Sequence, residues 1–256
     1  MQKVILLWGR STKPMQSVSP QYEAEEKITV NGNVDLYAVV FNRTTETDLT
    51  EDQLPQVDIY KYKQVIFVGD SRTEFMENVL TGMGESATKN VKFVCSAGKG
   101  LDWFTTTGWA QLYSIVQHDS NSILSKKTAV IFNFGVNDLS KSADYAEYYN
   151  WIAPQLKSKG CELYFMSVNP VNRLMLSNAG RADRSEAAVR SFNQYMKANL
   201  SSAYTYIDMY SYLKSTGYSF ASDHYGTGTV DDGLHYTTRT YKRIFAKCMD
   251  SLRVPA

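Results

Sequence analysis

Short apolar runs alternate with amphipathic segments from about residue 62 to the end of the chain. Five runs are almost continuously hydrophobic, as is typical of parallel strands covered on both faces: 65–69, 91–96, 129–135, 162–169 and 204–209. Helical spacing is found in the segments 72–83, 107–118, 142–158 and 184–200, and in a last segment after "HYTT". This alternation predicts an α/β fold, a three-layer α/β/α sandwich with a parallel sheet of about five strands.

The first part of the chain has a different pattern. The short apolar run "VILLW" near the start predicts a strand. Asn31-Gly32 lies between two β-prone runs, and this dipeptide is preferred in type I′ hairpin turns. No helical periodicity precedes residue 60, so we expect a small β structure here.

A polar segment separates the two patterns. Residues 42–58 are rich in Thr and acidic residues and contain one Pro, which is typical of a linker. We therefore predict three parts: a small β module or remnant over 1–45, a linker over 46–61 and a larger domain over 62–256.

The composition excludes several classes of function. The hydrophobic fraction of 43% is enough for a sizeable core, and the net charge of +1 favours neither nucleic acid nor an anionic membrane as a partner. No apolar run approaches the ~18 residues of a membrane span. The three cysteines have no metal-binding spacing, and we expect them to be buried free thiols that do not settle the cellular compartment.

Polar motifs follow the predicted strands and precede the last helix. The first strand ends in Gly69-Asp70-Ser71, the second is followed by Gly98 and Gly100, and the third by "GVND" with Asn137. "DDGLH", with His235, comes just before the final helix. Ligand sites of parallel α/β sheets lie at the carboxyl ends of the strands, so these motifs are expected to meet.

The residue types fit acyl transfer. Ser71 by itself is equally well explained as a helix cap. A serine nucleophile needs an imidazole to take its proton and a carboxylate to orient that imidazole, and Asp232 can reach His235 over one turn of chain. Asp231 is the alternative orienter, with less suitable spacing. Backbone N–H groups and an Asn amide can stabilise the oxyanion, each contributing roughly 3–4 kcal/mol.

Taken in order, "GDS", the loop glycine, "GVND" and "DGLH" resemble the motifs of the SGNH hydrolase (GDSL esterase/lipase) family over residues 62–256. The resemblance implies a flavodoxin-like fold and a serine hydrolase that acts on esters without metal or cofactor. It also implies the roles: Ser71 as nucleophile and oxyanion donor, Gly100 and Asn137 as further oxyanion donors, His235 as general base and then acid, and Asp232 as its orienter.

Three positions near these motifs are candidate substrate contacts. Arg72 stands where the family motif has Leu, and it could bind a substrate anion or pair on the surface of the first helix turn. Trp103 could stack on a sugar or pack at a helix start, and Asn169 belongs to "SVNPVNR" (167–173), which closes the fourth strand and begins a loop over the site. Gly98 competes with Gly100 for the oxyanion role, and the distance from the strand end favours Gly100.

A second resemblance concerns the first part of the chain. "YEAEEKITVNGNVDLYAVV" is similar to the end of a Listeria–Bacteroides-type surface β repeat, which implies a bacterial extracellular or cell-surface protein; a cytoplasmic protein is the alternative. Together the two resemblances imply an esterase that removes short acyl groups, acetyl above all, from a small-molecule or glycan ester. The alternatives are a lipase or phospholipid acylhydrolase, and a glycan-binding module without activity; the oligomeric state stays open.

Overall fold

A computed structural model describes the backbone of residues 4–10 and 36–42, and also residues 49–50, 53–57, 61–119, 127–172, 176, 184–221 and 233–252. The chain divides into two compact units, Met1–Glu46 and Thr47–Ala256. In the first unit β1 (Val4–Arg10) pairs with β2 (Leu36–Asn42) in antiparallel register. The strand predicted at "VILLW" is therefore confirmed, whereas the Asn31-Gly32 turn lies outside the described residues.

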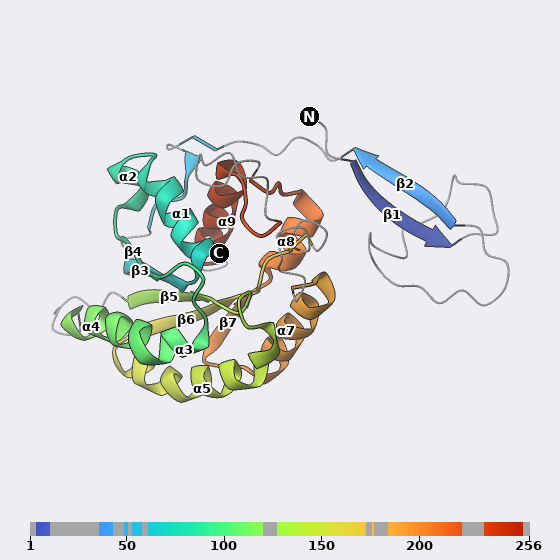
Figure 1. Cartoon of the computed structure of the whole chain (residues 1–256). Helices are drawn as coiled ribbons and strands as arrows, with labels where there is room; N and C mark the ends of the chain where they lie inside the picture. Colours follow the sequence, from blue (N-terminus) through green and yellow to red (C-terminus); the bar gives the residue numbers. More distant parts are fainter. Residues whose placement is uncertain are drawn as a thin grey trace. The chain divides into compact units, whose positions relative to one another are not determined.

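The second unit is built on a parallel sheet (Figure 1). Its strands lie in the order β4-β3-β5-β6-β7. They are β3 (Tyr62–Gly69), β4 (Val91–Cys95), β5 (Lys127–Asn133), β6 (Cys161–Met166) and β7 (Tyr204–Ile207). All five predicted strands are present and every pair is parallel, so the predicted fold class is confirmed.

Helices cover both faces of this sheet. The helices are α1 (Ser71–Thr81), α2 (Glu85–Thr88), α3 (Leu101–Trp103), α4 (Trp109–Asp119), α5 (Ser142–Ser158), α7 (Glu186–Asn199), α8 (Met209–Thr216) and α9 (Thr238–Ser251). A π-helical turn, η3 (Phe104–Gly108), joins α3 to α4, and a 3₁₀ turn, η4 (Leu139–Lys141), precedes α5. Figure 1 shows α1, α8 and α9 on one face and α4, α5 and α7 on the other.

The strands separate two apolar cores. Because successive strand residues point to opposite faces, Ile66 and Val68 of β3 pack in the core with α4, α5 and α7. Val65 and Phe67 pack in the core with α1, α8 and α9. All four side chains are fully buried. Burial on both faces explains why these strands are continuous in hydrophobic residues.

The structure differs from the predicted elements mainly in the following places. Strand β6 ends at Met166, whereas the apolar run predicted a strand to residue 169. The helical run before residue 119 begins at Leu101 rather than 107, because the Thr-rich stretch forms the π-helical turn instead of a loop. Met209, predicted at the end of a strand, begins α8. Leu54 and Val57 of the predicted linker are 3% and 7% exposed and pack in the core of the second unit. The sequence did not predict this packing, because two isolated apolar residues in a polar segment form no helical or strand periodicity.

Candidate active site

Ser71 lies at the junction of β3 and α1. Asp70 caps the helix: its carboxylate accepts a hydrogen bond from Arg72 N (3.0 Å), and its carbonyl accepts from the N–H groups of Thr73 and Glu74. These bonds use the first N–H groups of the helix other than that of Ser71. In the described part of the chain no acceptor lies on the Ser71 N–H, so this group is available to an oxyanion.

Only glycine fits at position 69, two residues before Ser71. A Cβ on Gly69 would lie 2.0 Å from Thr73 Oγ1 and 2.8 Å from Asn133 O of the neighbouring strand. Helix α1 and strand β5 therefore approach the backbone closely at this point. The close packing fixes the direction in which the chain leaves the sheet, and with it the position of Ser71.

His235 meets Ser71 from the far end of the sequence. It lies two residues before Thr237, the N-cap of α9, and its Nε2 is 2.8 Å from Ser71 Oγ. The imidazole stacks on the ring of Phe75 of α1, with centroids 4.3 Å apart. Both Ser71 and His235 are 4% exposed. The distance is suitable for transfer of the serine proton to the imidazole.

The predicted orienter lies outside the described residues. This applies to Asp232 and equally to its alternative, Asp231. The residue that follows them, Gly233, is described, and its carbonyl accepts a hydrogen bond from Asn172 N (2.8 Å). The choice between the two carboxylates therefore stays a prediction.

The loop after β4 lies against the loop after β5. Asn137 Nδ2 donates to Lys99 O (2.7 Å), which belongs to the same peptide unit as the N–H of Gly100. Gly98, by contrast, is exposed, has φ of 69° and would place a Cβ in open space. The Lys99–Gly100 peptide thus lies against Asn137, and the assignment of Gly100 rather than Gly98 as the loop donor stays a prediction.

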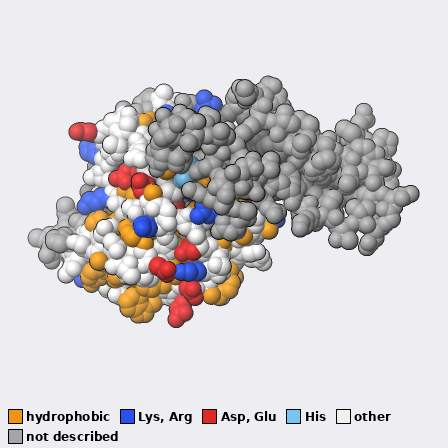
Figure 2. All heavy atoms as spheres, in the orientation of Figure 1, with side chains coloured by type: hydrophobic (Ala, Val, Ile, Leu, Met, Phe, Trp, Pro, Cys, Tyr) orange, Lys and Arg blue, Asp and Glu red, His pale blue; other side chains and the backbone are white. Residues whose placement is uncertain are grey.

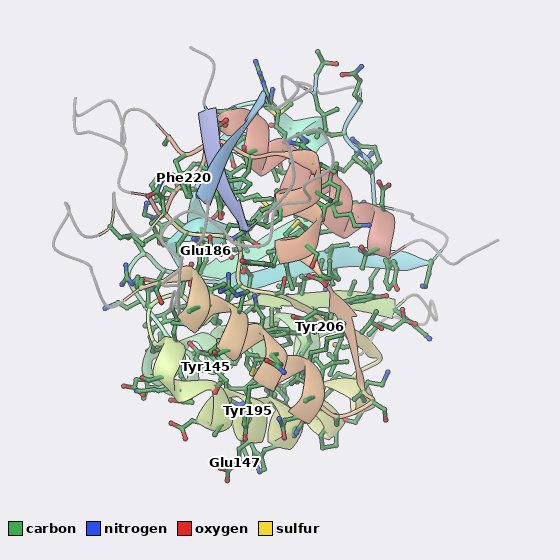
Figure 3. The ribbon with its side chains drawn as sticks, turned by 90° about the vertical axis from the view of Figure 1, so that its right-hand side faces the viewer. Tyr145, Glu147, Glu186, Tyr195, Tyr206 and Phe220 are labelled. Atoms are coloured by element: carbon green, nitrogen blue, oxygen red, sulfur yellow. The ribbon has the colours of Figure 1, made fainter. Side chains whose placement is uncertain are left out.

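Asp138 holds the loop of Gly100 in place. Its carboxylate accepts hydrogen bonds from Leu101 N (2.9 Å), at the start of α3, and from the hydroxyl of Tyr145 of α5 (2.7 Å), labelled in Figure 3. A Cβ on Gly100 would lie 2.3 Å from Asp138 Oδ2, so only glycine permits this approach. Burial raises the pKa of Asp138, although both hydrogen bonds favour its ionised form.

Arg184 is a site residue that the sequence analysis missed. Its Nη2 donates to Asn137 Oδ1 (3.0 Å). Because a guanidinium can only donate, this contact fixes the oxygen side of the Asn137 amide and leaves the NH₂ facing Lys99. Of the two NH₂ hydrogens, one is bonded to Lys99 O. The only hint in the sequence was an arginine before a helix cap, Ser185, which is too common to be informative.

Arg72 differs from both interpretations made from the sequence. It is 2% exposed, and its guanidinium donates to three backbone carbonyls, those of Leu234, Asn169 and Pro170. The interpretation as a surface pair is wrong, because α1 begins inside the protein. A substrate contact is also disfavoured, since the side chain is committed to the backbone of the protein.

The other two candidate contacts have different surroundings. Trp103 is half-buried beside the apolar core, with its ring 6.1 Å from that of Phe134, as expected for packing at a helix start. Asn169 is 1% exposed, and in the described part of the chain neither atom of its amide has a hydrogen-bond partner. An unpaired buried amide near Arg72 is the better candidate for a substrate contact.

Charges outside the site are mixed in sign. Acidic and basic side chains alternate over the described part of the face drawn in Figure 2, as expected for a net charge of +1. Among the described residues no three His, Cys, Asp or Glu side chains converge as metal ligands. In the same residues no helix is long and apolar enough to cross a membrane.

These features coincide with a match to a known family. A parallel α/β/α sandwich with a Ser–His pair at the carboxyl ends of its strands defines a class of hydrolases. Residues 65–248 match the family described as GDSL-like lipase/acylhydrolase, and the chain belongs to this family. A search of curated proteins found no match.

Three solved structures of low sequence identity are similar to this chain. A candidate SGNH hydrolase from Slackia heliotrinireducens is 12% identical with a TM-score of 0.50, covering 75% of this chain and all of its own. A candidate acylhydrolase from Bacteroides fragilis is 16% identical with a TM-score of 0.48, covering 78% of this chain and 92% of its own. An acetyl xylan esterase is 12% identical with a TM-score of 0.47, covering 74% of this chain and 100% of its own.

Proposed function

We propose that this chain is a serine esterase in which Ser71 is the nucleophile and His235 the general base. The observation that carries the proposal is the 2.8 Å contact between His235 Nε2 and Ser71 Oγ. The serine oxygen attacks the ester carbonyl carbon while its proton passes to Nε2. The oxyanion so formed lies near the N–H groups of Ser71 and Gly100 and the amide of Asn137.

The second half of the reaction uses the same groups. The protonated imidazole gives its proton to the leaving alcohol, and the acyl group stays on Ser71 Oγ. Water then attacks the acyl-enzyme, its proton passes to His235, and protonation of Ser71 Oγ releases the acid. In this proposal Asp232 holds the His235 ring in the tautomer with a lone pair on Nε2.

The substrate that we propose is an ester of a short acyl group, acetyl above all, on a carbohydrate. The enclosed position of Ser71 and His235, each 4% exposed, favours a small acyl group over a long chain. The unpaired amide of Asn169 supplies a donor and an acceptor that suit a sugar hydroxyl. The second resemblance, to a bacterial surface repeat, supports an extracellular carbohydrate.

Substitution of the proposed catalytic residues tests the mechanism. Ser71→Ala and His235→Ala are expected to reduce hydrolysis of p-nitrophenyl acetate to background, and Asp232→Asn to reduce kcat by about 10³- to 10⁴-fold. Asp231→Asn is the matched control and is expected to have activity close to wild type. Circular dichroism verifies that each variant is folded.

Three outcomes would contradict the proposal. Full activity in Ser71→Ala or His235→Ala excludes the mechanism. A wild-type protein that does not react with a fluorophosphonate probe is a binding module rather than an esterase. Activity that increases with acyl length in a series of model esters identifies a lipase instead of a short-chain esterase.

A further inference from the structure

Arg72 connects the two residues that exchange the proton. It follows Ser71 in the chain, and its Nε donates to Leu234 O (3.1 Å), the carbonyl of the residue before His235. Ser71 Oγ and His235 Nε2 are themselves 2.8 Å apart. Two adjacent residues on α1 are therefore bonded to two adjacent residues of the loop before α9, and the four form a closed ring of covalent and hydrogen bonds.

The same guanidinium reaches a third segment. Its Nη1 and Nη2 donate to Asn169 O (2.9 Å) and Pro170 O (3.0 Å), in the segment that follows β6. That segment is fixed independently, because Val171 N donates to Glu186 Oε1 (2.9 Å) of α7, labelled in Figure 3. Arg72 thus ties the His235 loop to a segment that is itself bonded to α7.

The residue on the other side of His235 also contacts Arg72. The guanidinium lies over the Tyr236 ring, 5.3 Å from its centroid. The Tyr236 hydroxyl donates to Pro170 O, which also accepts from Arg72. Both neighbours of His235 in the chain are therefore held by Arg72, one through its carbonyl and the other through its ring.

Stability alone does not explain a cation at this position. Removing a guanidinium from water is costly unless its donors are satisfied, and an aliphatic side chain would avoid this cost. A planar guanidinium has donors fixed in a fork, which suits three carbonyls from two segments better than any other side chain. The hydrogen bonds of the Arg72 guanidinium therefore fix the distance between α1 and the His235 loop, which an aliphatic side chain could not do.

We propose that Arg72 is a positioning residue that sets the distance and direction of the His235 imidazole relative to Ser71. The inference rests on the proposed function of the Ser71–His235 pair and deepens it. Arg72 has no role in substrate binding in this proposal. Its removal is therefore expected to lower kcat with little effect on KM, since a small displacement of a catalytic group can reduce the rate about 100-fold.

The test compares two buried arginines. Arg243 of α9 is 8% exposed, donates to Gly217 O (2.9 Å) and Thr216 O (3.3 Å), and lies over the ring of Tyr212. Like Arg72, it is buried, donates to backbone carbonyls and lies over a tyrosine ring. These contacts of Arg243 involve neither Ser71 nor the loop of His235. R72K is expected to reduce kcat by about 10- to 100-fold at nearly unchanged KM. R243K is expected to lower the melting temperature while kcat stays close to wild type.

A spectroscopic measurement makes the test independent of activity. In protein labelled with ¹⁵N-histidine, R72K is expected to shift the imidazole resonances of His235, assigned by their loss in His235→Gln. R243K is expected to leave them unchanged. R72M removes all three donors; R72K is the primary variant because the loss of every donor can unfold the protein.

The results distinguish failure of the positioning role of Arg72 from failure of the proposed esterase function. Wild-type kcat together with unchanged His235 resonances in R72K overturns the role of Arg72. An equal loss of kcat in R72K and R243K reduces that role to general stability. A wild-type protein without esterase activity overturns the proposed function, and in that case the His235 resonances of R72K still decide whether Arg72 positions the imidazole.

Discussion

Asp70 is a fully buried carboxylate beside Ser71, the proposed nucleophile. One of its oxygens caps α1, and in the described part of the chain the other has no hydrogen-bond partner. Burial raises the pKa of Asp70 from its ordinary value of 3.8 to about 6, against the hydrogen bond from Arg72 N and the charge of Arg72. At neutral pH the site therefore carries a buried negative charge on Asp70, and the contacts with Arg72 offset only part of the cost of its burial.

The raised pKa gives a prediction for stability against pH. A carboxyl group with a higher pKa in the folded state binds its proton more tightly when folded, so its ionisation destabilises the protein as pH rises through about 6. Asp70→Asn keeps a good cap and removes the charge. We expect it to raise the free energy of unfolding at pH 8 by up to about 3 kcal/mol, the equivalent of this shift.

The comparison at two pH values controls for the other effects of Asp70→Asn. Near pH 4 the buried carboxyl of the wild type is protonated, so the advantage of the variant should have largely disappeared. Urea denaturation at both values measures the difference. A variant that is less stable than wild type at pH 8 would contradict the account of Asp70.

At the scale of elements, the loop between β4 and α3 is shaped by contact with the loop after β5. Gly100 and Asp138 approach so closely that a Cβ on the glycine would overlap the carboxylate. The hydrogen bond from Leu101 N to Asp138 then fixes the start of α3. The hydrogen bond from Asn137 to Lys99 O then holds the Lys99–Gly100 peptide against the loop after β5, a contact that local sequence cannot specify.

This contact predicts different effects for two glycine substitutions. Gly100→Ala is expected to displace Asp138 and to lower kcat by about 10-fold or more, because the oxyanion donors move apart. Gly98→Ala meets no neighbour, and its φ of 69° costs about 1 kcal/mol of stability with kcat close to wild type. Steady-state kinetics and thermal denaturation of both variants check this. The opposite pattern in kcat would make Gly98 the donor.

At the scale of the whole molecule, every described site residue belongs to the second unit, Thr47–Ala256. Leu54 and Val57 belong to its core although they lie in the predicted linker. The functional unit therefore begins before β3, at a point that the strand and helix pattern did not indicate.

Two truncated chains test this boundary. A chain beginning at Thr47 is expected to keep wild-type kcat, since it retains the site and both core residues. A chain beginning at Lys61 loses the burial of Leu54 and Val57 and is expected to be about 3 kcal/mol less stable. Urea denaturation and ester hydrolysis measure both effects. Equal stability of the two chains would show that residues 47–60 do not belong to the unit.

Much of the second unit could be predicted because its signals are local. Strands buried on both faces require continuous hydrophobic runs, so β3 to β7 could be located from sequence. Helical periodicity located the five long helices, α1, α4, α5, α7 and α9. The helix start at Leu101 was missed because a π-helical turn continues the helix through the Thr-rich stretch, and α8 was missed because it has only eight residues and begins two residues after β7 ends.

The sequence by itself determined the order of the elements and the chemistry at the strand ends, including Ser71 and His235 as partners. Periodicity and motif order carry this information along the chain. Only the tertiary structure decided that Arg72 is buried, that Arg184 orients Asn137 and that Asp138 caps α3. The physical reason is that each of these roles depends on polar atoms from segments far apart in sequence, which meet only when the sheet and its loops have packed.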